Sequence, residues 1–573
     1  MNRKNLTAAV LAGLAGAAGI VGSAQAVNIN PDGLGQVLIY PYYTVNGGNT
    51  TALSVVNTTE EAKAVKVRFL EGQNSQEVLD FNLYMSKYDV WTAAIFDNEG
   101  TPTLVVNDTT CTVPYLYMND ANDDGERDGM QAFLPYELDD GGSTHISRTA
   151  EGHFEMIEMG TLVDDEMNSA TAATHVPQDE GPQMPPDSWI EPISDALGLD
   201  KRPCGQLNDA WTEPDNLTDG DEGYWLNTLY GPLTDLENPS GGLFGGAAIV
   251  NVDAGTMYSY DATAVNGFAE GLTDGEIPGT ALHQQPGYII PGLNSGDQLT
   301  GTVFLDDGST LTATMTRGVD AVSYVFMHDQ IMNEYTTEAA VNAATEWVIT
   351  FPTKQFYVFA DQTGDMDPPL APFTSEWLGE GACEYVQLDK IWDREEESPG
   401  TDPGTPIPPI VSPAPDEPPV EGKFPFELCY ETSVIAFDGT MDDDGDGGDG
   451  GDDPQIEHHL LPADEGGVTP ILGSTNFHII ENGALGFEYG WARLQMADYP
   501  PTNEDGEIIA GDDLTRSLGG LDGLPVTGFA VMRFENGFLG EGSNTLANYG
   551  GIFKHKATRR ETMASAAPGT AAQ

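Results

Sequence analysis

Hydrophobic and polar residues alternate along residues 36–106 with the period of two that a half-buried β-strand produces. Val65, Val67 and Phe69, for example, alternate with Lys66 and Arg68. Further apolar runs occupy residues 79–83 and 90–96, and turn-forming segments separate the runs at residues 46–49, 57–59 and 71–75. Because successive side chains of a strand point to opposite faces, this pattern predicts an antiparallel sheet with one face on a core and the other in water.

Residues 53–58, a charged turn and residues 65–69 resemble the strand pairing of immunoglobulin-like domains. The resemblance implies a β-sandwich and specifies no function. We therefore expect a mainly β protein of antiparallel immunoglobulin-like sandwich domains, with long acidic, Pro/Gly-rich insertions and few helices.

The composition changes along the chain and predicts its division. After residues 1–26, the predicted parts are an immunoglobulin-like sandwich (27–110), an acidic disulfide-closed insertion (111–226), a second β-rich domain (227–397), a Pro-rich loop (398–426), a β-rich C-terminal region with an acidic Asp/Gly loop (427–552) and a basic, disordered tail (553–573). Residues 319–335 are the best helix candidate, because Val322, Val325 and Phe326 fall near one face. Residues 347–359 predict another strand, which Pro352 places at an edge or a bulge.

The first 26 residues have the parts of a secretory signal peptide. Arg3 and Lys4 make a positive start, residues 6–21 are apolar, and Ala24 and Ala26 frame a small-x-small cleavage site. The apolar run is short for a bilayer span and rich in Gly, so we favour a cleaved signal over a retained anchor. The later sequence has no run of about 20 apolar residues. The sequence thus predicts an exported protein without a membrane span, extracellular or at the cell surface, with the periplasm left open.

The four cysteines, Cys111, Cys204, Cys383 and Cys429, form no CxxC pair. In an exported chain an even number of cysteines predicts disulfides, and four of them allow three connectivities. We favour Cys111–Cys204 with Cys383–Cys429, because each pair brackets a loop-rich insertion whose closure most restricts the unfolded chain. A catalytic thiol is the alternative, and it would need a nearby base.

The chain carries 91 acidic and 22 basic side chains, which gives a formal net charge of −69. Such a charge repels the phosphate backbone and excludes a nucleic-acid binder that works through a broad basic face. Excess carboxylates also keep a protein soluble in saline, calcium-containing water, where ions screen the repulsion between them. The charge therefore fits an exterior location.

Residues 120–128 have the spacing of a calcium-binding loop, D-x-N-x-D-G-x-x-D. Calcium takes about six to eight oxygen ligands, which a tight loop supplies from alternate positions. The predicted ligands are the side chains of Asp120, Asn122 and Asp124, the carbonyl of Glu126, and Asp128 directly or through water. The motif resembles the calcium loops of dockerin and thrombospondin type 3 repeats and the first half of an EF-hand.

The loop departs from the EF-hand at its twelfth position, which is Gln131 instead of Glu. Glu137, Asp139 or Asp140 would have to supply the missing carboxylate. The alternative is an acidic turn that binds only water. The Gly-rich acidic run at 442–453 has similar spacing, but its flexibility predicts weaker binding.

No sequence motif of a known catalytic class is present: the chain lacks H-E-x-x-H, G-x-S-x-G and Gly-rich phosphate loops. A secreted polysaccharide hydrolase stays an alternative, because acidic pairs are abundant although none stands out. A carbohydrate-binding or small-ligand module is another. The aromatic residues considered for sugar stacking are Tyr40, Tyr42, Tyr43, Trp91, Trp211 and Trp225, although such residues more often belong to the core or to a sheet face.

Four stretches, residues 35–43, 78–81 with 89–92, 347–354 and 548–551, resemble a family of exported bacterial cell-surface proteins. The resemblance implies a surface location and no activity or catalytic residues. We therefore expect a non-enzymatic protein of the cell surface or matrix, stabilised by two disulfides and by calcium, that acts in adhesion or assembly. Its expected partners are other surface or matrix components or further copies of itself.

Overall fold

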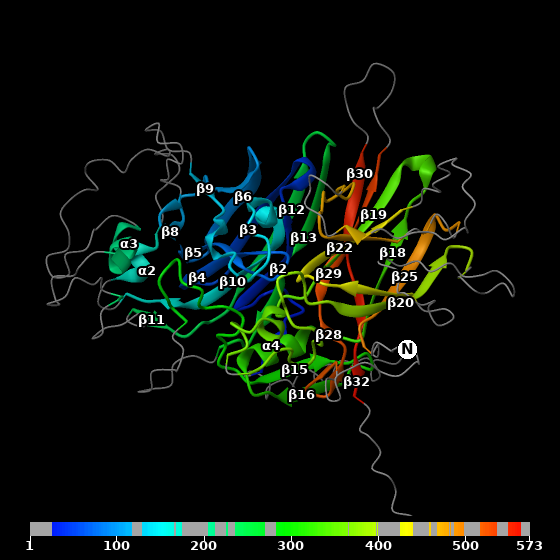
Figure 1. Ribbon diagram of the computed structural model, residues 1–573. Coiled ribbons are helices and arrows are strands. Elements are labelled where there is room, and N and C mark those ends of the chain that lie inside the picture. Colours follow the sequence, from blue (N-terminus) through cyan, green and yellow to red (C-terminus); the bar gives the residue numbers. More distant parts are fainter. Residues whose placement is uncertain are drawn as a thin grey trace, which may run out of the picture.

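Two β-sandwiches lie side by side, with short helices and strands below them in the view of Figure 1. The structure is a computed structural model that describes residues 26–116, 129–164, 168–174, 204–212, 225–226, 235–269, 282–364, 366–396, 398, 424–438, 458–459, 467–480, 482, 486–497, 516–535 and 548–562. The described chain is mainly β and its sheets are antiparallel with one parallel exception, which confirms the predicted fold class. Immunoglobulin-like topology stays a prediction.

The first sandwich pairs a sheet of eight strands with a sheet of six. The eight-stranded sheet has the order β1 (Asn28–Ile29), β14 (Thr263–Asn266), β2 (Val37–Thr44), β10 (Glu151–Leu162), β4 (Ala62–Glu71), β5 (Glu77–Met85) and β8 (Cys111–Val113), and β11 (Leu236–Glu237) pairs with β10. The six-stranded sheet has the order β13 (Thr256–Asp261), β12 (Leu243–Asn251), β3 (Asn49–Asn57), β6 (Val90–Asn98), β7 (Thr101–Val105) and β9 (Met130–Ala132).

Strand β4 shows both what alternation predicts and what it misses. Val65, Val67 and Phe69 point into the core between the two sheets, as expected. Lys66 and Arg68 on the other face were expected in water, yet both are buried. Residues 282–295 cover this face: the Gln284 carbonyl accepts a hydrogen bond from the Asn82 side chain at 2.8 Å, and the Gly287 N–H donates to Asp80 at 2.9 Å. The prediction that this face is exposed to solvent was wrong, because a segment distant in sequence covers it.

The second sandwich pairs a sheet of five strands with a sheet of six. The five-stranded sheet has the order β21 (Phe424–Leu428), β20 (Glu384–Asp393), β25 (Tyr489–Gln495), β18 (Gln330–Thr336) and β31 (Lys556–Thr558). The six-stranded sheet has the order β23 (His458–His459), β24 (Phe477–Ile480), β22 (Thr432–Phe437), β19 (Ala343–Thr350), β29 (Thr527–Phe534) and β30 (Tyr549–Lys554), of which β22 and β24 are parallel.

Aromatic side chains fill the core of the second sandwich and also join the two sandwiches. Inside, Tyr335 of β18 stacks on Phe437 of β22 with ring centroids 4.9 Å apart. On the opposite face of the six-stranded sheet, Phe529 of β29 stacks on Tyr260 of β13 at 5.0 Å. The Thr350 hydroxyl donates to the Pro41 carbonyl at 2.6 Å across the same joint. The six-stranded sheet is therefore buried on both faces, and the joint is part of the apolar core.

Short elements complete the described chain. The helices are α2 (Ser169–Ala172), α3 (Gly205–Thr212), α4 (Gly318–Phe326) and α5 (Gln355–Val358), with 3-10 turns η1 (Asn46–Gly48), η3 (Pro135–Glu137), η4 (Ile146–Ala150) and η7 (Ala339–Val341). The small sheets are β15 (Thr300–Phe304) with β16 (Thr310–Thr314), β17 (Met327–His328) with β28 (Leu524–Pro525), and β26 (Ser517–Leu518) with β27 (Leu521–Asp522) and β32 (Arg560–Glu561).

The helix expected over residues 319–335 ends at Phe326, and Met332 belongs to β18. The strand expected over 347–359 ends at Thr350 and is followed by α5. Strand pairing explains why the helix stops early. Residues 330–336 pair with β25 along their whole length and with β31 over residues 330–332. Sheet pairing here overrides a local helical period.

The sheets do not follow the predicted linear division of the chain. Strand β10, from the range predicted as an insertion, lies between β2 and β4 in the first sandwich. Strands β12, β13 and β14, from the range predicted as a second domain, complete the same sandwich. The reason is that β2, β3 and β4 have open edges, which strands distant in sequence pair with.

The predicted disordered tail is ordered up to residue 562. Residues 553 and 554 end β30 at the edge of one sheet, and β31 then pairs with the edge of the facing sheet. The Arg559 side chain donates to the Val325 carbonyl at 2.9 Å, and Arg560 pairs with Asp522 at 3.3 Å. The basic cluster therefore closes the second sandwich. Residues 1–25, the central part of the Pro-rich loop and residues 563–573 lie outside the described residues.

Candidate functional site

A cleft of about 280 Å³ at the edge of the eight-stranded sheet combines carboxylates with an exposed aromatic ring. Glu77 and Asp80 of β5 line it, together with Pro114, Tyr136 and Pro286. Paired carboxylates beside an aromatic ring are what the polysaccharide-hydrolase alternative requires. The cleft is therefore the place to test that alternative.

Each carboxylate of the cleft is bound to a cation from the neighbouring strand β4. Lys66 pairs with Asp80, and the Nε of Arg68 lies 2.6 Å from Oε2 of Glu77. Arg68 also pairs with Glu155 of β10. The pairing follows the sheet register, which places Lys66 beside Asn82 and Arg68 beside Asp80. Opposite charges at neighbouring positions of one face thus form an ionic ladder.

Burial changes the pKa values of the ionisable side chains in this ladder. Desolvation raises the pKa of Glu77 to about 7, against the opposing effect of Arg68 and with a smaller contribution from Asp80. Desolvation also raises the pKa of Glu155 and lowers the pKa of Lys66. The side chains of Glu77 and Asp80 are only 9% and 7% exposed. A general acid must reach a substrate atom, whereas these oxygens face their cations, so the geometry favours a structural role.

His153 of β10 lies fully buried on the same face as the ladder. Neither ring nitrogen has a hydrogen-bond partner in the described part of the chain. Desolvation, aided by Arg68, lowers its pKa to about 3. The ring is therefore neutral near pH 7, and its burial separates it from any substrate.

A second buried network ties the end of β4 to both halves of the molecule. Arg148 contacts Glu71 through Nε at 2.9 Å and Asp140 through Nη2 at 2.7 Å. Its guanidinium lies over the ring of Trp377, 5.7 Å from the centroid, and the Trp377 N–H donates to the Asp140 carbonyl at 2.9 Å. Asp140 is thus engaged by Arg148, which argues against its use as the missing calcium ligand.

Lys354 is another buried cation with structural partners. Its ammonium donates to the carbonyls of Leu428, Cys429 and Tyr430 at 3.4, 3.1 and 3.3 Å. Desolvation lowers the pKa of Lys354 to about 8, and the nearby Glu431 opposes this change. The lysine therefore fixes the chain around the second disulfide.

The predicted calcium ligands, Asp120, Asn122, Asp124, Glu126 and Asp128, all lie outside the described residues. The described chain stops at Leu116 and resumes at Gly129. Leu116 and Gln131, two described residues on either side of this segment, both line the 280 Å³ cleft. The acidic run at 442–453 also lies outside the described residues. Calcium binding stays a prediction.

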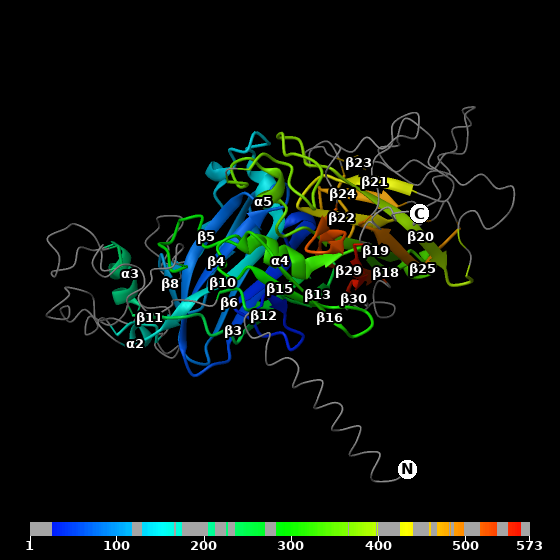
Figure 2. The ribbon, with the colours of Figure 1, turned by 90° about the horizontal axis from the view of Figure 1, so that it is seen from below.

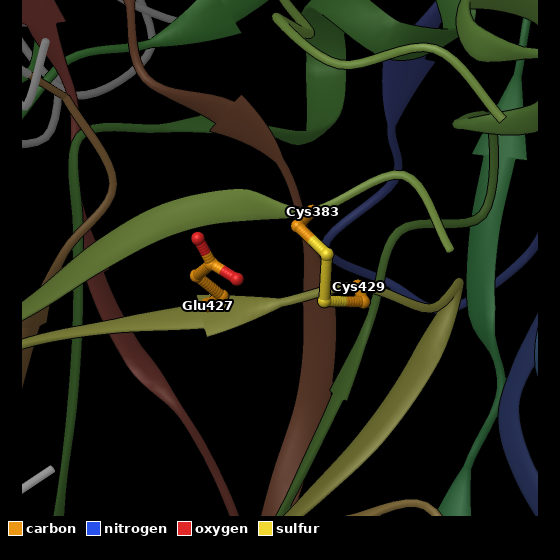
Figure 3. A group of neighbouring side chains, drawn as sticks. All are labelled: Cys383, Glu427 and Cys429. Carbon is orange, nitrogen blue, oxygen red and sulfur yellow. A yellow bond between two sulfur atoms is a disulfide. The ribbon is translucent and has the colours of Figure 1, made fainter. Parts of the chain in front are cut away.

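Both disulfides of the favoured pairing are present, Cys111–Cys204 and Cys383–Cys429. Figure 3 shows the carboxylate of Glu427 beside the second bridge. Among the residues that the structure describes, these three make the one group of metal-type ligands within 4.8 Å of one another. Sulfurs joined in a disulfide are not thiolates, so the group does not form a metal site. The same bonding excludes a catalytic thiol.

Comparison with protein-family models, with curated proteins and with solved structures finds no match for this chain. Function must therefore be argued from the molecule itself. Within the described residues no helix is long and apolar enough to cross a membrane.

The aromatic residues considered for sugar stacking are in the core. Tyr40, Tyr42, Tyr43 and Trp91 are fully buried, and Trp211 and Trp225 pack around Tyr84 and His283. The core interpretation of these residues is therefore confirmed and the stacking alternative was wrong, because aromatic rings next to alternating apolar residues join the sheet interior. The exposed aromatic side chains include Tyr489 and Trp491 of β25, which the sequence interpretation missed. Their alternation with Gly490 and Ala492 was the available signal.

Proposed function

We propose that this chain is an exported, non-enzymatic protein of the cell surface or extracellular matrix that acts in assembly. The observation that carries the proposal is a neutral outer face on the six-stranded sheet of the first sandwich. We define this neutral face by the outward side chains of four strands, Thr50, Ala52, Ser54, Val56, Val90, Thr92, Ala94, Phe96, Phe244, Gly246, Ala248, Val250, Met257 and Ser259. At the outward positions of these strands, Asp261 alone carries a charge, and it ends β13.

Cross-strand neighbours make the neutral face continuous. Phe244, Val56 and Val90 form one row across three strands, and Ala248, Ala52 and Ala94 form another. Met257, Val90 and Phe244 are 62%, 46% and 43% exposed, so the rest of the described chain leaves this face open to solvent. Exposed apolar patches of this kind on soluble proteins mark interaction sites.

The charge of the chain explains why a neutral face matters. With a net charge of −69, two copies repel each other at most surfaces. A face of uncharged side chains lets two sheets approach without burying carboxylates, which would require desolvation. We infer that this face meets a second copy of the chain.

Two further observations support the proposal. Both cysteine pairs are oxidised, which is compatible with an exported protein. The carboxylates of the described cleft are paired with Lys66 and Arg68, an arrangement suited to stability and not to acid–base chemistry. The surface location is also what the family resemblance implies.

The test is self-association of the full chain, measured by sedimentation and by cross-linking in fractionated cells. Ala52→Asp with Ala248→Asp, which are cross-strand neighbours, should abolish association. Ala52→Lys with Ala248→Lys should abolish it as well, because any buried charge opposes the contact. Leu378→Asp, at a 78% exposed loop position, is the matched control and should leave association unchanged. Recovery of the unmodified protein only as a free periplasmic monomer would contradict the proposal.

A further inference from the structure

A groove of about 350 Å³ lies at the joint between the two sandwiches. The first sandwich contributes residues of β1, β13 and β14 to its walls, and the second contributes residues of β29 and β30. Figures 1 and 2 both show β13 beside β29 and β30. Sites for small molecules often lie where two domains meet, and their volumes are about 300–1,000 Å³. The groove therefore has the position and the size of a site for a single small molecule.

Apolar side chains form much of the groove. The stacked rings of Tyr260 and Phe529 line it, 5.0 Å apart between centroids. A smaller cavity of about 40 Å³ adjoins the groove and is lined in part by His328 and His555. Burial lowers the pKa values of these two histidines to about 3 and 4, so both rings are neutral near pH 7. The groove and the cavity share the lining residues Ile29, Thr263, Thr527, Gly528 and Lys554.

Two side chains of opposite charge line the groove, Lys554 of β30 and Asp261 of β13. Strand register pairs Lys554 with Phe529, so the lysine side chain lies on the sheet face that meets the first sandwich. The charge of Asp261 acts on Lys554, but the two form no ion pair. Neither of them forms an ion pair with any other residue that the structure describes. A ligand in the groove therefore meets a cation on one wall and an anion on the other.

Lys554 lies in a basic environment despite the acidity of the whole chain. Partial desolvation lowers the pKa of Lys554, the charges of Arg559 and Lys556 lower it further, and Asp261 opposes them with a smaller effect. Repulsion among these three basic groups is unfavourable. A carboxylate bound at Lys554 would relieve that repulsion.

We infer that the groove binds a zwitterionic amino acid with an apolar side chain. The ligand carboxylate lies beside Lys554, and the ligand ammonium lies beside Asp261. Both contacts are charge-assisted hydrogen bonds, which are stronger than neutral ones. The apolar side chain packs against the rings of Tyr260 and Phe529 and leaves water there. Such a ligand pairs both charged side chains that line the groove.

Other small ligands fit these two charges less well. A simple apolar carboxylate would pair with Lys554 but bring its negative charge toward Asp261. An apolar amine would pair with Asp261 and add a fourth positive charge near Lys554. A neutral apolar molecule would desolvate both side chains and pair with neither, which costs free energy.

The inference does not rest on the proposed function. Asp261 lies at the edge of the neutral face, but Ala52 and Ala248, the positions of the self-association variants, do not line the groove. Ala52→Asp with Ala248→Asp should therefore bind the amino acid like the unmodified chain. Loss of association with retained binding, or the reverse, separates the two proposals.

The experiment measures binding of three matched probes to the full chain by isothermal titration, near pH 7 and at physiological ionic strength. L-Phenylalanine carries both charges, phenylpropionate lacks the ammonium, and phenethylamine lacks the carboxylate. We expect each of the two singly charged probes to bind about tenfold more weakly than phenylalanine, which is the factor that one charge-assisted contact supplies.

Two single variants assign each charge of the ligand to one wall of the groove. Lys554→Met should bind phenylalanine about tenfold more weakly and no longer distinguish it from phenethylamine. Asp261→Asn should likewise no longer distinguish phenylalanine from phenylpropionate. Both side chains are exposed, so both variants keep the fold. Lys87→Met and Asp253→Asn, at exposed positions outside the groove, are the matched controls and should bind all three probes like the unmodified chain.

Three results would overturn the inference. The first is an unmodified chain that binds none of the three probes. The second is equal affinity for phenylalanine and for either singly charged probe, which would reject a zwitterionic ligand. The third is unchanged discrimination among the probes in the Lys554 and Asp261 variants, which would place the binding site elsewhere.

Discussion

The outer sheet faces of the two sandwiches differ in the side chains that they expose. The neutral face of the first sandwich consists of small, aliphatic and hydroxyl side chains with two phenylalanines and a methionine, and a single aspartate lies at its edge. The outer face of the second combines the indoles of Trp392 and Trp491 with basic side chains and the carboxylate of Glu334. Both lie on a chain of net charge −69. Because most of the surface of such a chain is acidic, a sheet face that lacks acidic side chains is where we look for function.

The two faces also share a property, because each is the outer layer of a sandwich whose other faces are buried. The eight-stranded sheet is covered on its second face by residues 282–295, and the second six-stranded sheet is covered by the first sandwich. A face left open in such an arrangement is not covered by any part of the chain that the structure describes. That is the physical reason to seek its partner outside the chain.

The largest expected effect compares an inner with an outer tryptophan of the second sandwich. Trp347 of β19 is fully buried against Phe437, so Trp347→Ala should lower the free energy of unfolding by about 3–5 kcal/mol. Trp491→Ala should cost less, about 1–2 kcal/mol, because this side chain is only partly covered. Urea unfolding measures both. A stability loss in the Trp491 variant as large as in the Trp347 variant would mean that both tryptophans are core residues, and the contrast between the two faces of the sandwich would fail.

The next effect tests whether buried charges hold the two halves together. Arg148→Ala leaves Glu71 and Asp140 buried without their cation, which should lower the free energy of unfolding by about 3–5 kcal/mol. Arg394, whose side chain is 56% exposed beside Glu395, is the control, and Arg394→Ala should stay within about 0.5 kcal/mol. If the two variants are equally stable, the network contributes nothing to the joint.

A pH-dependent effect is expected in the first sandwich at His153. Its folded pKa of about 3 lies below the unfolded value of 6.5, so the unfolded chain binds more protons between these values. The stability that depends on the neutral ring is therefore complete above pH 6.5 and declines as the pH falls toward 3. His153→Phe keeps the ring and removes the titration. Relative to its difference at pH 7, the variant should gain about 2–3 kcal/mol at pH 4.5. A difference between the two proteins that does not change with pH would show that His153 is not buried as a neutral ring.

Salt should strengthen self-association through the neutral face. Between 0.15 and 1 M NaCl the Debye length falls from about 8 to 3 Å, which screens the repulsion between acidic copies. We expect the association measured by sedimentation to become about severalfold tighter. Association that weakens as salt is added would contradict a contact through an uncharged face.

The smallest expected effect concerns the calcium loop at residues 120–128. At a calcium concentration about ten times the dissociation constant, binding should add about 1.4 kcal/mol to stability and raise the melting temperature. Addition of a chelator should reverse the rise, and Asp124→Ala should abolish it. An Asp97→Ala variant, at an exposed strand end outside the motif, should respond to calcium like the unmodified chain. No response to calcium in the unmodified chain would reject the site.

Much of the strand structure could be predicted from the sequence, whereas the environment of each strand could not. The alternation at residues 65–69 places Val65, Val67 and Phe69 in the core correctly. It could not reveal that Lys66 and Arg68 are also covered, because the covering segment lies more than 200 residues away. The favoured disulfide pairing succeeded because each bridge closes a loop that the composition already marked.

For the candidate surfaces, too, the sequence indicates which side chains of one strand share a face but not which strands are neighbours. Alternation at residues 489–495 could have placed Tyr489, Trp491 and Arg493 on one side of a strand. It could not have brought Trp392 next to Trp491 or Lys390 next to Arg493, because those pairs depend on strand register across about a hundred residues of intervening chain.

By itself, the sequence determined that the chain is mainly β and strongly acidic. These properties depend on composition and on periods of a few residues, which are visible in one dimension. The tertiary structure decided which strands are neighbours, which polar faces are buried and which two faces stay open. Those outcomes depend on pairing between distant segments, since a strand edge accepts any partner of suitable pattern and only the folded chain selects one.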